Sequence, residues 1–347
     1  MSYIHGARLA LVVGAAWLTI ALPLGPGVNE LAGASTVRVA APANGHWSAP
    51  VTLFRDNKGA SIATISCEPA HFCVATGTEG SNLAGQGIGL SYAAAWSAPV
   101  VIDKFGGLTA VSCAPGGPCT AVGPEQYGQG DNTYRFSGGR WAPGPVAPMA
   151  LGSVSCPTAN FCAGVGFLNY ASATVFNGTS WSPQARIAIE GASISCPTKA
   201  FCAVVGAGQV IYYRDGAWSK ATTIDRDRDL GSVSCPSARF CVAVDPSGNA
   251  LSDVDGKWST PDYSAPLDRI SSLTGVSCPT TTFCVAVDST GQAYLYNGSR
   301  WSSPQTISSN IYFTSVSCPR VNFCAASGQN SFTSPTVAYA VTFSRST

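Results

Sequence analysis

Charged residues and histidines are both scarce in this chain of 347 residues. Only 11% of the residues are charged, the formal net charge is +1, and Lys and Arg do not gather in any stretch. Because nucleic-acid binding relies on clustered basic residues, no nucleic-acid partner is expected. Beyond the N-terminal leader the histidines are His46 and His71. Two histidines are too few for a Ser-His-Asp set in each of seven repeats.

Long apolar runs are missing after the first residues. Residues 9–24 are largely apolar, follow Arg8, and lead to a small-residue cleavage site at 32–34. This pattern predicts a signal peptide over residues 1–34. The apolar run is short and broken by Pro23, which argues against the alternative of an uncleaved membrane anchor. We therefore expect a secreted, extracellular or cell-surface protein, with no membrane span after signal cleavage.

Cysteine, in contrast, is abundant and regularly spaced. Seven times the chain repeats a Ser-Cys pair, five residues, a second Cys and a small apolar run. The first cysteines are separated by 46, 43, 40, 39, 43 and 40 residues. A period near forty built from strands is typical of β-propeller blades. The pairs are Cys67 and Cys73, Cys113 and Cys119, Cys156 and Cys162, Cys196 and Cys202, Cys235 and Cys241, Cys278 and Cys284, and Cys318 and Cys324.

One repeat illustrates the strands expected in every blade. Its apolar segment, Phe240 to Val244, does not alternate, so both faces of that strand should be covered. Asp255-Gly256 suits a two-residue hairpin turn, because these residues tolerate positive φ angles. The same turn signal precedes a tryptophan at 44–45, 177–178, 215–216 and 297–298. The four predicted strands are 232–234, 240–244, 249–254 and one that begins at 257, with a turn over 236–239.

The two ends of the repeat array are complementary. The seventh repeat ends with a strand around 336–343 and has no tryptophan strand, whereas residues 44–48 form a tryptophan strand with no preceding blade. The N-terminal strand should therefore complete blade seven and close the ring, which removes two open sheet edges. The prediction is an all-β, seven-bladed propeller with four-stranded blades, a single domain over residues 35–347 and a monomer.

Paired cysteines in an exported chain predict disulfides, one within each repeat. The two cysteines of each pair would face each other across the first hairpin, and each bridge would contribute roughly 2 kcal/mol. The alternative is a metal–thiolate site. The spacing is not Cys-x2-Cys and histidine is scarce, so no metal or other cofactor is expected.

The repeated phrase resembles that of exported actinobacterial proteins built from tandem Ser-Cys-Pro-x3-Phe-Cys-x-Ala-Val-Gly units. Residues 195–206 and 277–287 carry the resemblance most fully, and it covers all seven repeats. It implies export and a β-propeller without an assigned activity.

A weaker resemblance is to Asp-box propellers, which include sialidases. Residues 215–218 and 297–301 look like altered versions of the Ser-x-Asp-x-Gly-x-x-Trp hairpin, which is a structural turn in that family. The family's catalytic set would be three arginines, an acid and a tyrosine with a glutamate partner, usually opening with Arg-Ile-Pro. That motif is absent here. The glutamates that remain after the leader are Glu68, Glu79, Glu125 and Glu190.

Functional residues are expected on one face of the ring. The Cys-x5-Cys turns and the Asn-Gly or Asp-Gly turns form one uniform face, whereas the loops of the other face vary, and variable loops on a rigid scaffold usually carry function. The run from Asp225 to Asp229 places oxygens at alternate positions, as in a calcium loop; local salt bridges with its two arginines are the alternative. The candidate binding residues are Tyr127, Asp131, Tyr170, Asp225, Asp227, Asp229, Asp268 and Arg269.

Each repeat also contributes a tryptophan and a serine. The tryptophans are interpreted as packing residues, with sugar platforms as the alternative, and the serines as structural. The tryptophans are Trp47, Trp96, Trp141, Trp181, Trp218, Trp258 and Trp301; the serines are Ser66, Ser112, Ser155, Ser195, Ser234, Ser277 and Ser317.

Three functions fit these observations. The leading hypothesis is a secreted, non-catalytic propeller that binds a glycan or protein at the cell surface. A glycan-cleaving enzyme is the second, and it would need two carboxyl groups about 5 to 10 Å apart, drawn from Glu125, Asp131, Asp227, Asp229 and Asp268. The third is a structural envelope protein without a small ligand.

Overall fold

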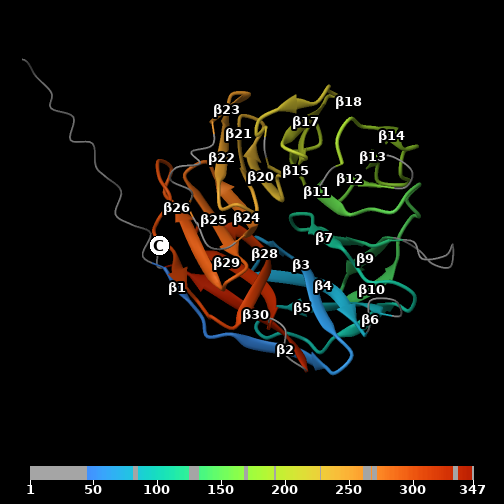
Figure 1. The fold of residues 1–347 in the computed structure, drawn as a ribbon. Coiled ribbons are helices and arrows are strands. Elements are labelled where there is room, and N and C mark those ends of the chain that lie inside the picture. The colour runs from blue at the N-terminus through green and yellow to red at the C-terminus, as the bar shows by residue number, and fades with distance from the viewer. Residues whose placement is uncertain are drawn as a thin grey trace, which may run out of the picture. The chain divides into compact units, whose positions relative to one another are not determined.

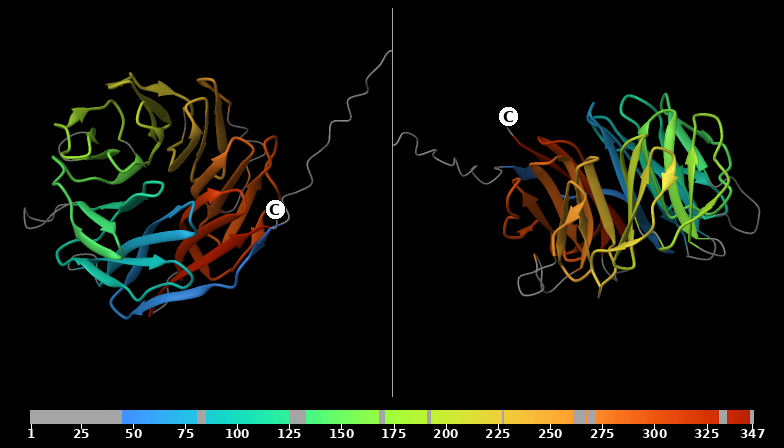
Figure 2. Two further views of the ribbon diagram at one scale, coloured as in Figure 1. Left: turned by 180° about the vertical axis from the view of Figure 1, so that it is seen from behind. Right: turned by 90° about the horizontal axis from the view of Figure 1, so that it is seen from above.

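The computed structural model describes residues 45–80, 85–124, 133–167, 171–190, 193–226, 228–260, 267, 272–330 and 335–345. These residues form seven antiparallel sheets arranged in a ring, and the predicted seven-bladed β-propeller is confirmed (Figures 1 and 2). Among the described residues no helix is long and apolar enough to cross a membrane. The predicted signal peptide lies outside them.

Blades one to three follow one another along the chain. Blade one contains β3 (Ala60–Glu68), β4 (Phe72–Glu79), β5 (Gln86–Tyr92) and β6 (Val100–Asp103). Blade two contains β7 (Ala110–Cys113), β8 (Cys119–Val122), β9 (Thr133–Ser137) and β10 (Arg140–Pro143). Blade three contains β11 (Ser153–Thr158), β12 (Phe161–Phe167), β13 (Ala171–Phe176) and β14 (Ala185–Arg186).

Blades four to six repeat this order. Blade four contains β15 (Ser193–Thr198), β16 (Phe201–Gly206) and β17 (Gln209–Arg214), with both β18 (Ala217–Trp218) and β19 (Thr222–Thr223) on β17. Blade five contains β20 (Ser232–Ser237), β21 (Phe240–Val244), β22 (Ala250–Val254) and β23 (Lys257–Trp258). Blade six contains β24 (Leu273–Thr280), β25 (Phe283–Asp288), β26 (Gln292–Tyr296) and β27 (Gln305–Thr306).

Blade seven joins the two ends of the repeat array, as the sequence predicts. It contains β28 (Ile311–Arg320), β29 (Phe323–Asn330) and β30 (Thr336–Ser344), and β30 also pairs with β1 (His46–Trp47) and β2 (Val51–Asp56). Trp47 lies opposite Phe343. A Cβ at Gly45 would overlap the Phe343 ring, so only glycine lets the first strand approach this closely.

The second strands are buried on both faces, as their unbroken apolar sequences predict. Every residue of β16, β21 and β25 is buried. One core cluster joins Phe201 and Val205 of blade four to Val233 and Leu251 of blade five. Apolar contact between blades therefore holds the ring together, because a single blade cannot bury both faces of its own sheet.

All seven predicted disulfides are present, and each joins the first strand of a blade to its second, as the sequence predicts. The Cα–Cα distances are 3.8–4.1 Å, and the second cysteine of every pair is at most 2% exposed. Seven disulfides suggest an oxidising, extracellular environment. The bonds are Cys67 to Cys73, Cys113 to Cys119, Cys156 to Cys162, Cys196 to Cys202, Cys235 to Cys241, Cys278 to Cys284, and Cys318 to Cys324.

In blade five the turn that the disulfide spans is shorter than predicted. The sequence places a turn over 236–239, but strand β20 continues through Pro236 to Ser237. The pairing register shifts between Ser234 and Ser237. Proline is tolerated there because β20 is an edge strand of its sheet and the β-bulge interrupts the backbone hydrogen bonds between β20 and β21.

The tryptophan hairpins divide into two kinds, which corrects the prediction of one turn type. Asp215 and Asp255 have φ angles of 47° and 54°, and the glycine after each also has positive φ, as a type I′ turn requires. At Asn177 and Asn297 only the following glycine has positive φ. There the asparagine Oδ1 accepts hydrogen bonds from backbone N–H groups two and three residues later. One extra residue before the tryptophan makes these turns longer.

The first strands lie nearest the centre of the ring (Figure 1). They line a channel of about 290 Å³ whose described lining residues are all uncharged. In each blade the serine before the first cysteine accepts a hydrogen bond, through Oγ, from the N–H of the first cysteine in the next blade. The N–O distance is 2.9 Å at every junction: Ser66–Cys113, Ser112–Cys156, Ser155–Cys196, Ser195–Cys235, Ser234–Cys278, Ser277–Cys318 and Ser317–Cys67.

The repeated Ser-Cys phrase therefore has a structural cause. The inner edge of each first strand would otherwise leave backbone N–H groups unpaired, and the neighbouring serine supplies the acceptor. A second set of such bonds lies two residues earlier and is incomplete. Blades two and six have Ala110 and Gly275 at the accepting position, where the other blades have a hydroxyl. The bonds present are Thr64–Val111, Ser153–Ile194, Ser193–Val233, Ser232–Val276 and Ser315–Ile65.

Candidate functional site

Two of the eight predicted binding residues are described by the structure. Asp229 is exposed on the variable-loop face. Asp225 is only 2% exposed, and its backbone N–H donates to the Gly208 oxygen at 2.9 Å. The remaining predictions lie outside the described residues and stay predictions: Tyr127, Asp131, Tyr170, Asp227, Asp268 and Arg269.

Asp229 lines a hollow of about 520 Å³ on the variable-loop face. We call it the loop-face hollow. Its lining comes from blades two to five: Thr109, Pro124, residues 150–152, Gly166, Glu190, Ala207 and residues 229–231. Thr109, Gly152 and Gly231 also line the central channel, so the hollow adjoins the channel mouth.

Backbone packing explains why this hollow has a firm floor. Leu151 and Leu230 are buried, at 1% and 0% exposure, just before the first strands of blades three and five. A Cβ at Gly166 would overlap the Ala150 carbonyl oxygen, so glycine is required where the end of β12 meets the chain entering β11. The floor therefore belongs to the rigid inner part of the blades, with the exposed side chains above it.

Two carboxylates give the loop-face hollow its charge. Glu190 and Asp229 are both exposed, and no Lys, Arg or His is among the described lining residues. Each stands six residues before the first cysteine of its blade, so they occupy the same place in adjacent repeats. Sequence reasoning missed Glu190 as a site residue, although aligning the repeats on their cysteines would have paired it with Asp229.

The other chemical predictions for this face stay predictions. Four of the five acids considered for glycan cleavage lie outside the described residues: Glu125, Asp131, Asp227 and Asp268. Among the described residues, Asp229 and Glu190 are two carboxylates that line the same hollow. Within the described residues no group of three or more potential metal ligands is found. The alternatives of a calcium loop and local salt bridges at 225–229 both stay predictions, because Asp227 in the middle of the run lies outside the described part.

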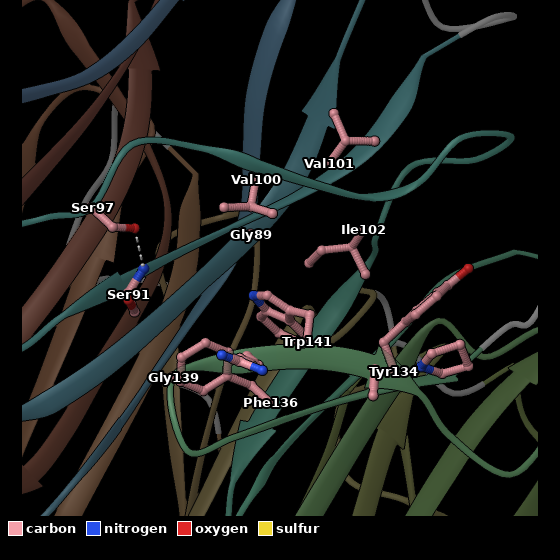
Figure 3. A pocket seen from close by; sticks show the side chains of 13 residues that line it. Gly89, Ser91, Ser97, Val100, Val101, Ile102, Tyr134, Phe136, Gly139 and Trp141 are labelled. Atoms are coloured by element: carbon pink, nitrogen blue, oxygen red, sulfur yellow. Dashed lines mark hydrogen bonds between the residues drawn. The ribbon is translucent and has the colours of Figure 1, made fainter.

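A second concavity lies at the rim, between the outer strands of blades one and two (Figure 3). We call this concavity of about 430 Å³ the rim groove. Val100 and Ile102 of β6 face Trp141 of β10 and Phe136 across the concavity, and the Val101 side chain points the other way (Figure 3). Arg140 is the charged residue of the lining. No sequence pattern predicted this groove, because its sides come from two repeats.

The repeated tryptophans pack against aromatic rings of their own blades, as their structural interpretation predicts. Ring centroids are 5.0–5.5 Å apart in six blades, with tilted planes. The pairs are Trp47–Phe343, Trp96–Tyr92, Trp141–Phe136, Trp181–Phe176, Trp218–Tyr213 and Trp301–Tyr296. Trp141 alone among the seven also lines one of the two concavities described above.

Blade five departs from this pattern. Asp253 stands opposite Trp258 where the other blades have an aromatic residue, and it is only 2% exposed. Tyr212 of blade four reaches across: its hydroxyl donates to Asp253 Oδ2 at 2.8 Å and accepts from Trp258 Nε1 at 2.7 Å. Burial, and then the hydrogen bond to Asp253, raise the pKa of the Tyr212 phenol. This hydrogen-bonded chain replaces an aromatic contact with a polar seam between two blades.

Comparisons with known proteins identify the fold only. No protein-family model matches the chain, and no curated protein does. Among solved structures, "YCF48 bound to D1 peptide" is similar with a TM-score of 0.62 and 12% identity over 87% of this chain and 95% of that one. The WD40 β-propeller domain of Doa1 gives 0.61 and 11%, over 86% and 97% of the two chains. The structure of U3-55K gives 0.65 and 9%, over 84% and 98%. At such low identity these similarities concern architecture alone.

Proposed function

We propose that this protein is an exported, non-catalytic β-propeller that binds a protein partner at the cell surface through the loop-face hollow. The observation that carries the proposal is the position of Asp229. The sequence singled it out on the face where the loops vary, and it lines a concavity at the channel mouth together with Glu190. Seven disulfides support export, because such bonds persist in oxidising compartments.

The chemistry of the hollow favours a protein segment over a glycan. An aromatic ring suits the face of a sugar, but no aromatic side chain is among the described lining residues. Pro124 and Ala207 give the hollow accessible apolar surface, and the two carboxylates face solvent. An apolar segment bearing a Lys or Arg complements this combination, because opposite charges steer and orient partners. The YCF48 structure contains a bound peptide, so a β-propeller of similar architecture accommodates one.

Parallel peptide and glycan arrays test the proposal. The oxidised protein should bind peptides with a basic residue among apolar ones, more weakly at high salt. Asp229→Asn with Glu190→Gln should weaken that binding roughly tenfold or more, since loss of both charges removes more than about 1.4 kcal/mol. Asp215→Asn is the matched control, because Asp215 is exposed in a turn on the opposite face and asparagine tolerates its positive φ.

Three outcomes would contradict the proposal. Binding unchanged in the double variant would mean that the partner contacts another part of the ring. Binding confined to the glycan array would replace the protein partner with a sugar. Cleavage of an array glycan, lost in Asp229→Asn, would make the protein an enzyme rather than a binding scaffold.

A further inference from the structure

The outer strands of the blades differ from one another in length and in what they expose. Strands β14, β18, β23 and β27 contain two residues each, whereas β6 and β10 contain four and β2 contains six. The two four-residue strands belong to adjacent blades and flank the rim groove. Blades one and two therefore present longer outer edges than blades three to six do.

Strand β6 is also the most apolar of these edges. Val100 and Val101 are 52% and 43% exposed. At the same distance after the tryptophan, three blades have polar or small residues: Ala185–Arg186, Thr222–Thr223 and Gln305–Thr306. Two others have a single exposed valine beside a threonine or a proline: Val51–Thr52 and Pro145–Val146. Folded proteins usually protect edge strands with charge, proline or short length, because an open edge pairs with other chains. An exposed pair of valines on a long edge is therefore unusual within this molecule.

Neither of the other long edges is left open in this way. Strand β2 contains Arg55 and Asp56, and β10 contains Arg140 and ends at Pro143, which has no N–H to donate. Strand β6 contains no Lys, Arg or Pro. Its one charged residue, Asp103, is buried and accepts a hydrogen bond from the Phe105 N–H at 2.8 Å. Within the described sheets β6 pairs only with β5, so its outer side is an edge.

The rim groove continues this edge into blade two. A Cβ at Gly89 would lie 2.5 Å from Ile102 and 2.8 Å from Trp141, so glycine lets the indole of blade two settle against blade one. Figure 3 shows Val100 and Ile102 facing the aromatic side of the groove. The Ser97 hydroxyl has hydrogen-bond partners within the protein: its Oγ accepts from the Ser91 N–H and donates to the Ala98 oxygen. The lining therefore offers apolar contact, one cation at Arg140 and few hydrogen-bonding groups for a sugar.

We propose that the rim groove is a second docking site, which binds an extended segment of a partner protein that pairs with β6 as an added strand. The segment carries apolar side chains at alternate positions, because successive residues of a strand face opposite sides and one side faces the groove. It also carries an acidic residue or a carboxyl terminus that meets Arg140. About four to six extended residues match the length of β6 at roughly 3.3 Å per residue. The site is separate from the loop-face hollow.

The test is selection of a phage-displayed library of random nonapeptides on the oxidised wild-type protein, followed by affinity measurements on the enriched peptides. Val100→Gln with Val101→Thr places the residues of blade six at the equivalent positions of blade one, so this variant should fold. This variant should bind the enriched peptides with an affinity roughly tenfold lower or more. Arg140→Gln should weaken those with an acidic residue by a smaller factor. Val51→Gln, at the same repeat position on β2 but outside the groove, should change nothing; Val51 is 49% exposed.

Hydrogen exchange on the bound complex gives a second measurement. Strand pairing should protect backbone amides of β6 when the peptide is added. The proposal is overturned if no alternating apolar peptide is enriched, or if the enriched peptides bind the valine variant unchanged. It is also overturned if the wild type self-associates in sedimentation and the valine variant does not, since the occupant is then a second copy. Arg140-dependent binding of an array glycan would equally exclude it.

Discussion

The inner and outer strands of the same blades obey different constraints. Around the channel the seven first strands make the same contact with their neighbours. In each, the backbone N–H of the first cysteine donates a 2.9 Å hydrogen bond to the serine Oγ of the neighbouring blade. At the rim the outer strands range from two to six residues and expose valine, threonine or charged residues. Around the channel most positions that touch the next blade are repeated, whereas positions that face solvent at the rim diverge. Both candidate docking sites lie where the repeats diverge.

Complete reduction of the seven disulfides, which lie in the inner hairpins, should lower the stability of the protein more than any other change considered. Each bridge closes a short loop and contributes roughly 2 kcal/mol in the chain-entropy model. Seven such terms approach or exceed the total stability of about 5–15 kcal/mol typical of a folded protein. We expect the reduced protein to unfold at a temperature where the oxidised protein is folded, as followed by circular dichroism. Equal urea midpoints for the oxidised and reduced protein would show that the bridges contribute little.

Tyr212→Phe should break the polar seam between blades four and five at smaller cost. The substitution leaves the buried Asp253 carboxylate without its phenol donor, and hydrogen bonds to charged groups contribute about 1.5–3 kcal/mol. Tyr296→Phe is the control, since Tyr296 meets Trp301 through its ring. Urea unfolding of both variants measures the difference. An equal loss of unfolding free energy in the two variants would mean that the hydrogen bonds of the Tyr212 hydroxyl add no stability.

The same residue gives a pH dependence. The pKa of Tyr212 is raised in the folded protein, mainly by burial and then by its hydrogen bond to Asp253. The unfolded chain releases this proton near pH 10, while the folded protein still holds it. Stability contributed by the protonated phenol is therefore complete below about pH 10 and is lost as the pH rises toward the folded pKa. Tyr212→Phe should flatten the alkaline fall in urea midpoint; an unchanged slope would contradict this.

Sequence reasoning reached the features that repeat. The blade count, the ring closure at Trp47 and the disulfide pairs followed from periodicity, because each repeat must solve the same local problem. The partners of the repeated serines could not be read in this way, since they depend on how one blade is rotated against the next. The rim groove could not be predicted for the same reason, because Val100 and Trp141 belong to different repeats. Asp253 was not recognised as the exception opposite Trp258, although aligning the blades reveals it.

The incomplete second set of inner hydrogen bonds offers the smallest effect and a direct test of the account. If these positions are repeated because they join neighbouring blades, a hydroxyl at positions 110 and 275 should complete the set of hydrogen bonds. A Cβ at Gly275 would lie 3.4 Å from the Val316 nitrogen, which leaves room for a serine directed at that N–H. Ala110→Ser and Gly275→Ser should each gain about 0.5–1.5 kcal/mol, the usual net contribution of one hydrogen bond.

The decisive measurement is the urea unfolding free energy of Ala110→Ser beside that of Ser195→Ala. The account predicts opposite signs: a gain for Ala110→Ser, and a loss of about 1–3 kcal/mol for Ser195→Ala, because the Cys235 N–H loses its acceptor. A neutral Ser195→Ala together with a destabilising Ala110→Ser would contradict it. The serine and threonine hydroxyls would then not stabilise the contact between neighbouring blades.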